Sequence, residues 1–323
     1  MNVLVTGGAG FIGSHLCERL LARGHSVVAL DNFDPFYPRA VKERNLAVAR
    51  RSERFRLAEA DIRDLDGAER ALDALGVGAL DVVVHLAAKA GVRPSLEQPL
   101  LYTQVNLDGT TAMLELARRR GCARFVFGSS SSVYGNNAKV PFAETDPVDH
   151  PISPYAATKR AGELLCHTYH HLYGLSVVCL RFFTVYGPRQ RPDLAIHKFA
   201  RLMLAGRPIP LYGDGSTARD YTYVDDILQG IEAAVGYTAE QPRAFEIVNL
   251  GGSRTTPLTR LVELLAGELG VEPSIEWLPP QPGDVERTFA DTGKAARLFG
   301  YAPATPIEPG IVRFAEWLRG EPY

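Results

Sequence analysis

A glycine-rich turn comes directly after the first apolar run of the chain, and no other feature limits the fold as strongly. Val3 to Thr6 has the composition of a short strand, and Gly7, Gly10 and Gly13 follow it as a helical pattern begins. Glycine permits the tight turn and the close approach of a ligand to the backbone, and the free amides at a helix start suit a pyrophosphate. The strand, turn and helix together predict a dinucleotide-binding βαβ unit.

A carboxylate stands at the end of the second predicted strand. Ser26 to Leu30 is largely apolar, and Asp31 follows it, 18 residues after Gly13. A carboxylate at this place accepts hydrogen bonds from the adenosine ribose and repels a 2′-phosphate. Asn32 rather than an arginine comes next, which agrees with an unphosphorylated ribose. The sequence therefore predicts NAD as the cofactor.

Predicted strands and helices alternate through the first part of the chain. After the first two strands, we expect strands at Phe55 to Ala60, Leu80 to Leu86, Arg124 to Phe127 and Leu175 to Phe183. The helices between them include a long one at about Pro99 to Arg120. This alternation predicts the α/β class, with a doubly wound parallel (Rossmann) sheet.

The predicted elements become shorter and less regular after Phe183. We expect the NAD-binding Rossmann domain to span residues 1–183, with residues 224–252 returning to it. Residues 184–323 are expected to form mainly a smaller, interleaved mixed α/β substrate domain.

A run of serines and a Tyr-Lys pair are the candidate catalytic groups. Ser129 to Ser132 follow the fifth predicted strand, and Tyr155 and Lys159 stand four residues apart in a helix expected from Pro154 to Tyr173. Residues at this spacing lie on one face of a helix. The phenol, the ammonium and a strand-end hydroxyl then converge on one substrate hydroxyl, and the cation is expected to lower the pKa of the phenol. The pair alone is weak evidence, because such spacings also arise by chance.

Composition and charge exclude several classes of function. The net charge is −2 without a basic excess, so nothing predicts nucleic-acid binding. The four cysteines share no metal spacing, which predicts free buried thiols in a reducing compartment and no metal site. The sequence has no signal-peptide pattern and no apolar run of membrane length, so we expect a cytoplasmic protein without membrane contact.

On these residues and motifs the chain resembles the extended short-chain dehydrogenase/reductase superfamily, and within it the nucleotide-sugar 4-epimerases. The resemblance implies that Tyr155, assisted by Ser130, removes the proton of the sugar 4-hydroxyl while the hydride of carbon 4 passes to NAD. It implies that the hydride returns to the opposite face of a transient 4-keto sugar, so that NAD is held tightly, and that Lys159 binds the nicotinamide ribose. The cofactor contacts expected from the glycine turn and the resemblance are Gly7, Gly10, Phe11, Ile12, Gly13, Asp31, Asn32, Asp61, Ile62, Leu86, Ala87, Ala88, Lys89, Asn106, Tyr155 and Lys159.

The serine run also bears on the type of reaction. The related 4,6-dehydratases carry an Asp-Glu pair directly before the Val-Tyr-Gly motif, and the related UDP-glucuronate decarboxylases carry a Glu at the second of these positions. This chain has Ser131 and Ser132 there. Dehydration and decarboxylation are therefore disfavoured, and reversible redox at carbon 4 is expected.

Two segments, Thr184 to Asp193 and Asp31 to Tyr37, are similar to the UDP-glucuronate 4-epimerases in particular. The resemblance implies that Arg191, with Thr184 and Ser131, holds the sugar carboxylate, a group that suits a charge-assisted and bidentate contact with arginine. We therefore expect conversion of UDP-glucuronate to UDP-galacturonate. A UDP-glucose or UDP-N-acetylhexosamine 4-epimerase, and a non-catalytic regulator that binds NAD and a nucleotide sugar, stay open as alternatives.

The resemblance further implies contacts to the nucleotide end of the substrate. Arg219 and Arg287 match positions that contact the diphosphate, and Tyr212 matches one that packs on uracil. Asp284 is expected near the uridine ribose, and Arg93 is expected to reach a phosphate or the sugar.

Two predicted amphipathic helices bear on assembly. The helices at about Pro99 to Arg120 and Pro154 to Tyr173 resemble those that form a four-helix bundle across the dimer in this family. The resemblance therefore implies a homodimer.

Overall fold

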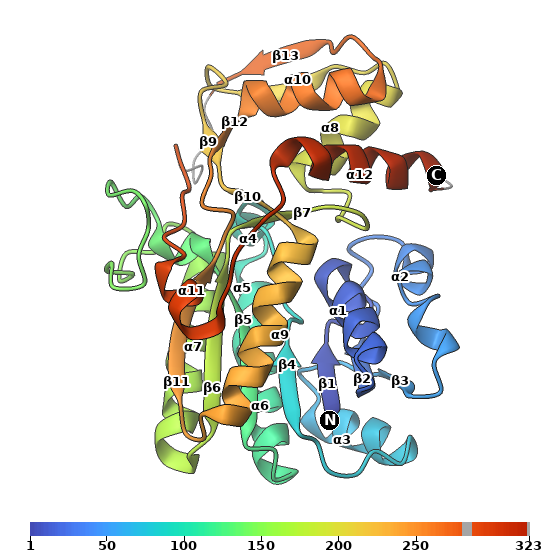
Figure 1. The fold of residues 1–323 in the computed structure, drawn as a ribbon, viewed down its shortest axis with the longest axis vertical. Helices are drawn as coiled ribbons and strands as arrows, with labels where there is room; N and C mark the ends of the chain where they lie inside the picture. The colour runs from blue at the N-terminus through green and yellow to red at the C-terminus, as the bar shows by residue number, and fades with distance from the viewer. Residues whose placement is uncertain (280–285, 322–323) are drawn as a thin grey trace.

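One seven-stranded sheet is the largest element of the structure, a computed structural model that describes residues 1–279 and 286–321. All neighbouring strands of this sheet run parallel (Figure 1). The strands are β1 (Asn2–Thr6), β2 (Ser26–Asp31), β3 (Phe55–Glu59), β4 (Val82–His85), β5 (Arg124–Ser130), β6 (Ser176–Phe182) and β11 (Phe245–Leu250). Their order is β11-β6-β5-β4-β1-β2-β3, so the direction of strand addition reverses between β1 and β4. The predicted α/β class and doubly wound parallel sheet are confirmed.

Both faces of this sheet are buried, because alternate strand residues enter two different cores. Val3 and Val5 of β1 belong to one cluster of buried residues, and Leu4 belongs to the other. In β5, Val126 joins the first cluster and Phe125 the second. This alternation follows from the two-residue period of a strand, and the near-continuous apolar runs are typical of parallel sheets that are covered on both sides.

Helices cover the two faces of the sheet. One face carries α1 (Phe11–Ala22), α9 (Val224–Glu240) and, beside α9, α11 (Gly293–Phe299). The other face carries α3 (Leu65–Ala74), α6 (Gly109–Arg119) and α7 (Pro154–Tyr173). Figure 1 shows α1 and α9 in front of the sheet strands.

Helix α7 has the predicted bounds because both of its ends carry clear signals. The Ser153 hydroxyl accepts a hydrogen bond from the Ala156 amide at the first turn, and Pro154 takes the first helical position. Gly174 ends the helix in the left-handed conformation, with a φ of 71°.

Strand β5 continues to Ser130, beyond the predicted end at Phe127. Ser129 pairs with Arg181 of β6, and Ser130 pairs with Phe182. The prediction ended the strand too early because it followed the apolar run, whereas backbone groups make the ladder whatever the side chain.

The single long helix expected at Pro99 to Arg120 is not uniform. It consists of α5 (Pro99–Thr103), a π-helical turn at Gln104–Asp108, and α6. Asn106 lies in the π turn, and its side chain bonds to the backbone of Lys89. Such turns often occur at functional sites, and here the turn places a polar side chain against the loop after β4.

A smaller region lies above the carboxyl ends of the sheet strands in Figure 1. Its strands pair as β7 (Thr184–Tyr186) with β10 (Tyr221–Tyr223), β8 (Ile209–Tyr212) with β13 (Ile275–Leu278), and β9 (Ala218–Arg219) with β12 (Thr256–Pro257). Its helices are α8 (Ala195–Leu204), α10 (Leu258–Leu269) and α12 (Ile307–Gly320). Because β11 lies in the large sheet, the chain leaves this region and returns to it. The domain boundaries given above stay a prediction.

Several short elements lie between these parts. They are α2 (Arg39–Asn45), α4 (Val92–Glu97) and the 3₁₀ turns Ala49–Arg51 and Ser131–Tyr134. In residues 1–279 and 286–321, no helix has both the length and the apolar character needed to cross a membrane. All four cysteines are free and buried, as predicted.

Candidate active site

The glycine-rich turn leaves no room for side chains where β1 passes into α1. Gly7 has a φ of 68°, and a Cβ atom there would lie 2.9 Å from the amide nitrogen of Ala87. A Cβ atom on Gly13 would overlap the carbonyl oxygen of Gly7. Helix α1 begins at Phe11 without a side-chain cap, so its first amides and its positive dipole suit a phosphate group.

Asp31 ends β2 with its carboxylate buried at the same edge of the sheet. Its oxygens accept hydrogen bonds from the Ala9 amide at 3.1 Å and the Phe33 amide at 2.8 Å. The buried Lys42 ammonium lies 3.4 Å from Asp31 Oδ1 and faces the ring of Tyr37. Oδ1 accepts from both the Phe33 amide and the Lys42 ammonium, whereas Oδ2 accepts only from the Ala9 amide, so Oδ2 keeps the capacity to bind a ribose hydroxyl.

A cavity of about 520 Å³ opens at the carboxyl ends of the strands, beside the point where the strand order reverses. It brings together most of the predicted site residues from separate strand ends and loops. The predicted residues that line it are Gly7, Gly10, Phe11, Ile12, Gly13, Asp31, Asn32, Asp61, Ile62, Leu86, Ala87, Ala88, Lys89, Ser130, Ser131, Tyr155, Lys159, Thr184 and Arg191.

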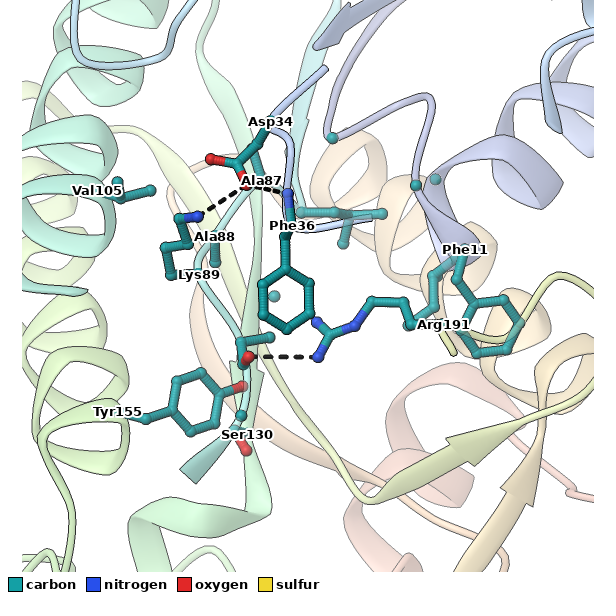
Figure 2. A pocket seen from close by; sticks show the side chains of 18 of the residues that line it. Phe11, Asp34, Phe36, Ala87, Ala88, Lys89, Val105, Ser130, Tyr155 and Arg191 are labelled. Carbon is teal, nitrogen blue, oxygen red and sulfur yellow. Dashed lines mark hydrogen bonds and ion pairs between the residues drawn. The ribbon is translucent and has the colours of Figure 1, made fainter. Parts of the chain in front are cut away.

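Tyr155, Ser130 and Lys159 come together where the end of β5 meets the first turns of α7. Figure 2 shows the Tyr155 ring and the Ser130 side chain directed toward the same space. The Ser130 hydroxyl donates to Ser132 Oγ at 3.2 Å, and Lys159 Nζ donates to the Gly128 carbonyl oxygen at 2.6 Å. All three residues line the cavity, and their predicted convergence on one substrate hydroxyl stays a prediction.

Burial controls the protonation of these groups. It raises the pKa of Tyr155, while the Ser130 hydrogen bond and the Arg191 charge lower this pKa. Burial lowers the pKa of Lys159 to about 8. Ser130 and Arg191 are the groups that lower the Tyr155 pKa here, while the ammonium of Lys159 is turned to the Gly128 carbonyl. The expected effect of Lys159 on the Tyr155 pKa stays a prediction.

Arg191 reaches the cavity from the loop after β7, and its guanidinium is already held by the protein. Asp193 accepts hydrogen bonds from Nε at 3.0 Å and from Nη2 at 2.7 Å. The Ala90 carbonyl oxygen accepts from Nη2 at 3.3 Å, and the Phe36 ring lies 5.3 Å from Cζ. In Figure 2 the guanidinium lies beside the Phe36 ring. A bidentate contact with a substrate carboxylate requires two neighbouring guanidinium nitrogens. Asp193 already occupies one such pair, Nε and Nη2.

A buried ion pair lies between α7 and the ends of β5 and β6. Glu163, one helical turn beyond Lys159, accepts two hydrogen bonds from Arg181 at 2.8 Å each. It also accepts the Ser129 hydroxyl at 2.7 Å, and both charged side chains are almost completely buried. Helix α7 is thus fixed to the ends of β5 and β6 by charged contacts as well as by packing.

Comparison with known proteins agrees with this geometry. The profile of the NAD dependent epimerase/dehydratase family matches residues 3–251. This chain belongs to that family. A probable UDP-glucuronate 4-epimerase of Rhizobium meliloti is 41% identical over 333 residues, which are 98% of this chain and 96% of the relative.

Two solved structures show the same fold in full. The UDP-glucuronic acid 4-epimerase of Bacillus cereus, in complex with UDP-glucuronic acid and NAD, has a TM-score of 0.91 at 36% identity, with 99% of both chains covered. The UDP-glucose 4-epimerase of Thermus thermophilus, in complex with NAD, has a TM-score of 0.87 at 36% identity, also with 99% of both chains covered. The predicted resemblance to the epimerases is confirmed.

NAD is the cofactor of this epimerase/dehydratase family, and the residues of this chain fit it. The glycine turn lets backbone approach a pyrophosphate where a Cβ atom has no space, and Asp31 stands at the end of β2, where the ribose is expected. The small side chains of Ala87 and Ala88 line the cavity just after the carboxyl end of β4. Among the described residues, no group of three or more His, Cys, Asp or Glu side chains is arranged to hold a metal ion.

Asn106 acts on the cavity through the loop after β4 and does not line it. Its side chain accepts from the Lys89 amide at 2.8 Å and donates to the Lys89 carbonyl oxygen at 3.0 Å. It also donates to the Thr158 hydroxyl at 3.0 Å, next to Lys159. Its predicted contact with the cofactor stays a prediction, and the structure gives it a role in fixing the loop to α7.

Four of the residues predicted for the nucleotide end, Arg93, Tyr212, Arg219 and Arg287, lie outside this cavity. Arg93 lies over the Tyr212 ring, with 4.5 Å between Cζ and the ring centre. Arg219 Nη1 donates to the Ala218 carbonyl oxygen at 3.1 Å. The backbone of Arg287 forms an isolated β-bridge with Ala218. The fifth, Asp284, lies outside the described residues.

Sequence reasoning missed several residues that hold the site. They are Lys42 beside Asp31, the Glu163–Arg181 pair, Asp193 beside Arg191, and Tyr102 beside Tyr155. The one available signal was spacing, because Glu163 follows Lys159 by the same four residues that separate Lys159 from Tyr155.

Proposed function

We propose that this protein catalyses the NAD-dependent 4-epimerisation of a UDP-sugar, with UDP-glucuronate converted to UDP-galacturonate. One observation carries the proposal: a guanidinium, that of Arg191, shares the cavity with Tyr155, Ser130 and the glycine turn. The redox groups account for the reaction type, and the guanidinium accounts for an acid substrate. A neutral hexose offers this guanidinium hydroxyl acceptors but no opposite charge.

In this proposal Tyr155 is the acid and base. As a tyrosinate it accepts the proton of the sugar 4-hydroxyl, and the Ser130 hydroxyl donates a hydrogen bond that stabilises the phenolate. NAD supplies the hydride acceptor and later the hydride donor. After the 4-keto sugar turns its other face, Tyr155 returns the proton to the new hydroxyl. Lys159 lies at the cofactor side of Tyr155 and orients the nicotinamide ribose.

The serine turn after β5 supports epimerisation over elimination. Ser131 and Ser132 occupy the 3₁₀ turn next to Ser130, so this turn supplies hydroxyls and no carboxylic acid. Removal of water from a sugar needs a general acid or base at the departing group. Reversible transfer of hydride and proton at carbon 4 needs none beyond Tyr155.

The sugar acid is proposed to lie between Arg191, Thr184 and Ser131, all of which line the cavity. Oxidation of carbon 4 of a uronate produces a β-keto acid, which loses carbon dioxide when its C–C bond aligns with the carbonyl π system. Hydrogen bonds from these side chains fix the carboxylate away from that alignment. The uridine diphosphate end is assigned to Arg93, Tyr212, Arg219 and Arg287, with Asp284.

We also propose a homodimer formed through α5, α6 and α7. Leu100 of α5 is 78% exposed and Leu164 of α7 is 53% exposed, so both helices present large apolar side chains. Sedimentation of the purified protein is expected to give twice the chain mass, and Leu100→Glu with Leu164→Glu is expected to give a monomer. A wild-type monomer contradicts the assembly without affecting the proposed chemistry. The buried free thiols support a reducing, cytoplasmic location.

Product analysis tests the proposed function. The purified protein is incubated separately with UDP-glucuronate and UDP-glucose, and NMR follows the anomeric and carbon-4 protons. UDP-galacturonate from the first incubation is the expected result. UDP-galactose from the second alone would establish a UDP-glucose 4-epimerase instead. If neither substrate is converted and no reduced-cofactor absorbance appears, the protein is a binder and the proposal fails.

A further inference from the structure

Three groups of this chain, a carboxylate, a backbone carbonyl and an aromatic ring, hold the Arg191 guanidinium. Asp193 engages Nε and one N–H of Nη2, and the Ala90 carbonyl oxygen accepts from Nη2 as well. The Phe36 ring lies 5.3 Å from Cζ, at cation–π distance. Within residues 1–279 and 286–321 no hydrogen bond engages Nη1. Nη1 is therefore the nitrogen that Arg191 offers to a substrate.

The Ala90 carbonyl connects this guanidinium to a second aromatic residue. Tyr102 donates its hydroxyl to the same oxygen at 3.0 Å, and its side chain is buried to 2% exposure. Burial raises the pKa of Tyr102 to about 12, so the hydroxyl stays a donor across the working range of an enzyme.

Tyr102 also contacts the catalytic tyrosine. Its ring meets the Tyr155 ring edge to face, with centroids 6.3 Å apart and an interplanar angle of 87°. One side chain of α5 thus touches Tyr155 directly and holds the carbonyl that Arg191 binds. The position of the acid-binding group and the position of the proton acceptor are set together.

We infer that Asp193 and Tyr102 are positioning residues that fix Arg191 so that only Nη1 meets the acid group of the substrate. The inference rests on the proposed function and names the groups that make its site selective. A free arginine binds a carboxylate through a two-nitrogen edge and turns with it. Here Asp193 covers the Nε–Nη2 edge and Ala90 takes one N–H of the remaining end, so the substrate carboxylate has one approach.

This restraint has a chemical consequence at the 4-keto stage. If the carboxylate turns, the C5–C6 bond breaks and its electron pair forms the C4–C5 enolate. Carbon dioxide leaves, carbon 5 takes a proton from water, and a UDP-4-keto-pentose results. The hydride taken from carbon 4 then stays on the cofactor. Loss of either positioning residue is therefore expected to increase decarboxylation relative to epimerisation.

The test uses Tyr102→Phe and Asp193→Asn in the full chain with NAD bound. Tyr301→Phe is the matched control, because the buried Tyr301 hydroxyl also donates to a backbone carbonyl, that of Gly251, at 3.0 Å. NMR of the UDP-glucuronate reaction gives the ratio of decarboxylated to epimerised product, which does not depend on how much enzyme is folded. We expect each variant to raise this ratio about tenfold, the factor that corresponds to about 1.4 kcal/mol. The control keeps the wild-type ratio.

The outcomes separate this inference from the proposed function. If wild-type protein makes no UDP-galacturonate, the proposed function fails and the inference fails with it. If wild-type protein epimerises UDP-glucuronate while both variants turn over at the wild-type ratio, the inference alone is overturned. A rise of equal size in Tyr301→Phe would also overturn it, because any buried hydroxyl would then have the same effect.

Discussion

Lys159 Nζ donates a hydrogen bond to the carbonyl oxygen of Gly128, 2.6 Å away, and so joins α7 to β5 near its end. The Lys159 side chain is only 5% exposed, and its ammonium lies over the Phe127 ring, 5.0 Å from the ring centre. A buried ammonium with one hydrogen bond to a carbonyl is poorly compensated for lost water. Burial of the Lys159 ammonium therefore carries a cost in folding stability, which fits the role proposed for this residue.

Lys159→Met is expected to stabilise the cofactor-free protein at pH 7 and to abolish turnover. The pKa of Lys159 is about 8 in the folded chain and 10.5 ordinarily, so burial of the charge costs up to about 3 kcal/mol below pH 8. Loss of the Gly128 hydrogen bond offsets about 1 kcal/mol, which leaves a gain of roughly 1–2 kcal/mol. Between about pH 8 and 10.5 the folded protein binds fewer protons than the unfolded chain, so the gain shrinks as pH rises. Urea unfolding at pH 7 and 10 measures both effects, and a variant less stable than wild type at pH 7 contradicts the argument.

Ser130→Ala is expected to raise the pH at which Tyr155 loses its proton and the reaction begins. The Ser130 hydrogen bond lowers the pKa of Tyr155, so without it the tyrosinate forms only at higher pH. The rising limb of the kcat profile should shift upward by about one pH unit, because a single hydrogen bond to the charged form has an effect of that order. Ser176→Ala serves as the control, since the buried Ser176 hydroxyl donates to the Gln241 carbonyl at 2.8 Å at the opposite end of a sheet strand. An unshifted limb in Ser130→Ala would remove Ser130 from the proposed proton transfer.

Gly13→Ala is expected to lower both stability and NAD content. The new methyl group overlaps the Gly7 carbonyl oxygen, so backbone must shift, at a cost of about 1–3 kcal/mol. Gly236→Ala in α9 is the matched control, because nothing lies within 4 Å of its new Cβ atom. The control should gain about 0.5–1 kcal/mol from helix propensity. Thermal unfolding and the cofactor absorbance of the purified proteins measure the two effects, and equal behaviour of the two variants would show that the turn is not tightly packed.

The parts of the molecule that sequence predicts well are those whose signals are local. The glycine turn, Asp31 at a strand end and the bounds of α7 each depend on residues within a few positions of one another. The π turn is less local, because the Asn106 side chain within it contacts Lys89, 17 residues away. Hydrophobic periodicity carries no information on that contact, so the pattern predicts one uniform helix.

The contacts that fix the site are mostly distant in sequence. Glu163 of α7 pairs with Arg181 of β6, 18 residues later in the chain. Tyr102 of α5 contacts Tyr155 of α7. Asp193 is only two residues from Arg191, yet the pairing depends on a loop conformation that composition does not specify. Sequence therefore predicts which groups carry the chemistry, and the fold shows which groups hold them.

Glu163→Gln is expected to destabilise the protein by about 3–5 kcal/mol, because it leaves the Arg181 charge buried without a counter-ion. Glu163→Leu combined with Arg181→Met is expected to cost less, since neither charge of the fully buried pair remains and Arg160, which also contacts Glu163 at 3.1 Å, is partly exposed. The exposed pair Arg260–Glu263, 3.2 Å apart in α10, supplies the control. Glu263→Gln should change the free energy of unfolding by less than about 1 kcal/mol.

Urea unfolding of these variants decides whether the buried pair acts through charge compensation. A larger loss in the double variant than in Glu163→Gln would mean that shape and the Ser129 and Tyr134 contacts of the pair outweigh its electrostatics. The smaller loss expected for the double variant, together with reduced turnover, would show that the pair is retained because it holds Ser129 and the end of β5 against α7. The proposed catalytic groups Ser130 and Lys159 stand on those two elements, so their separation is set by a contact that touches neither of them.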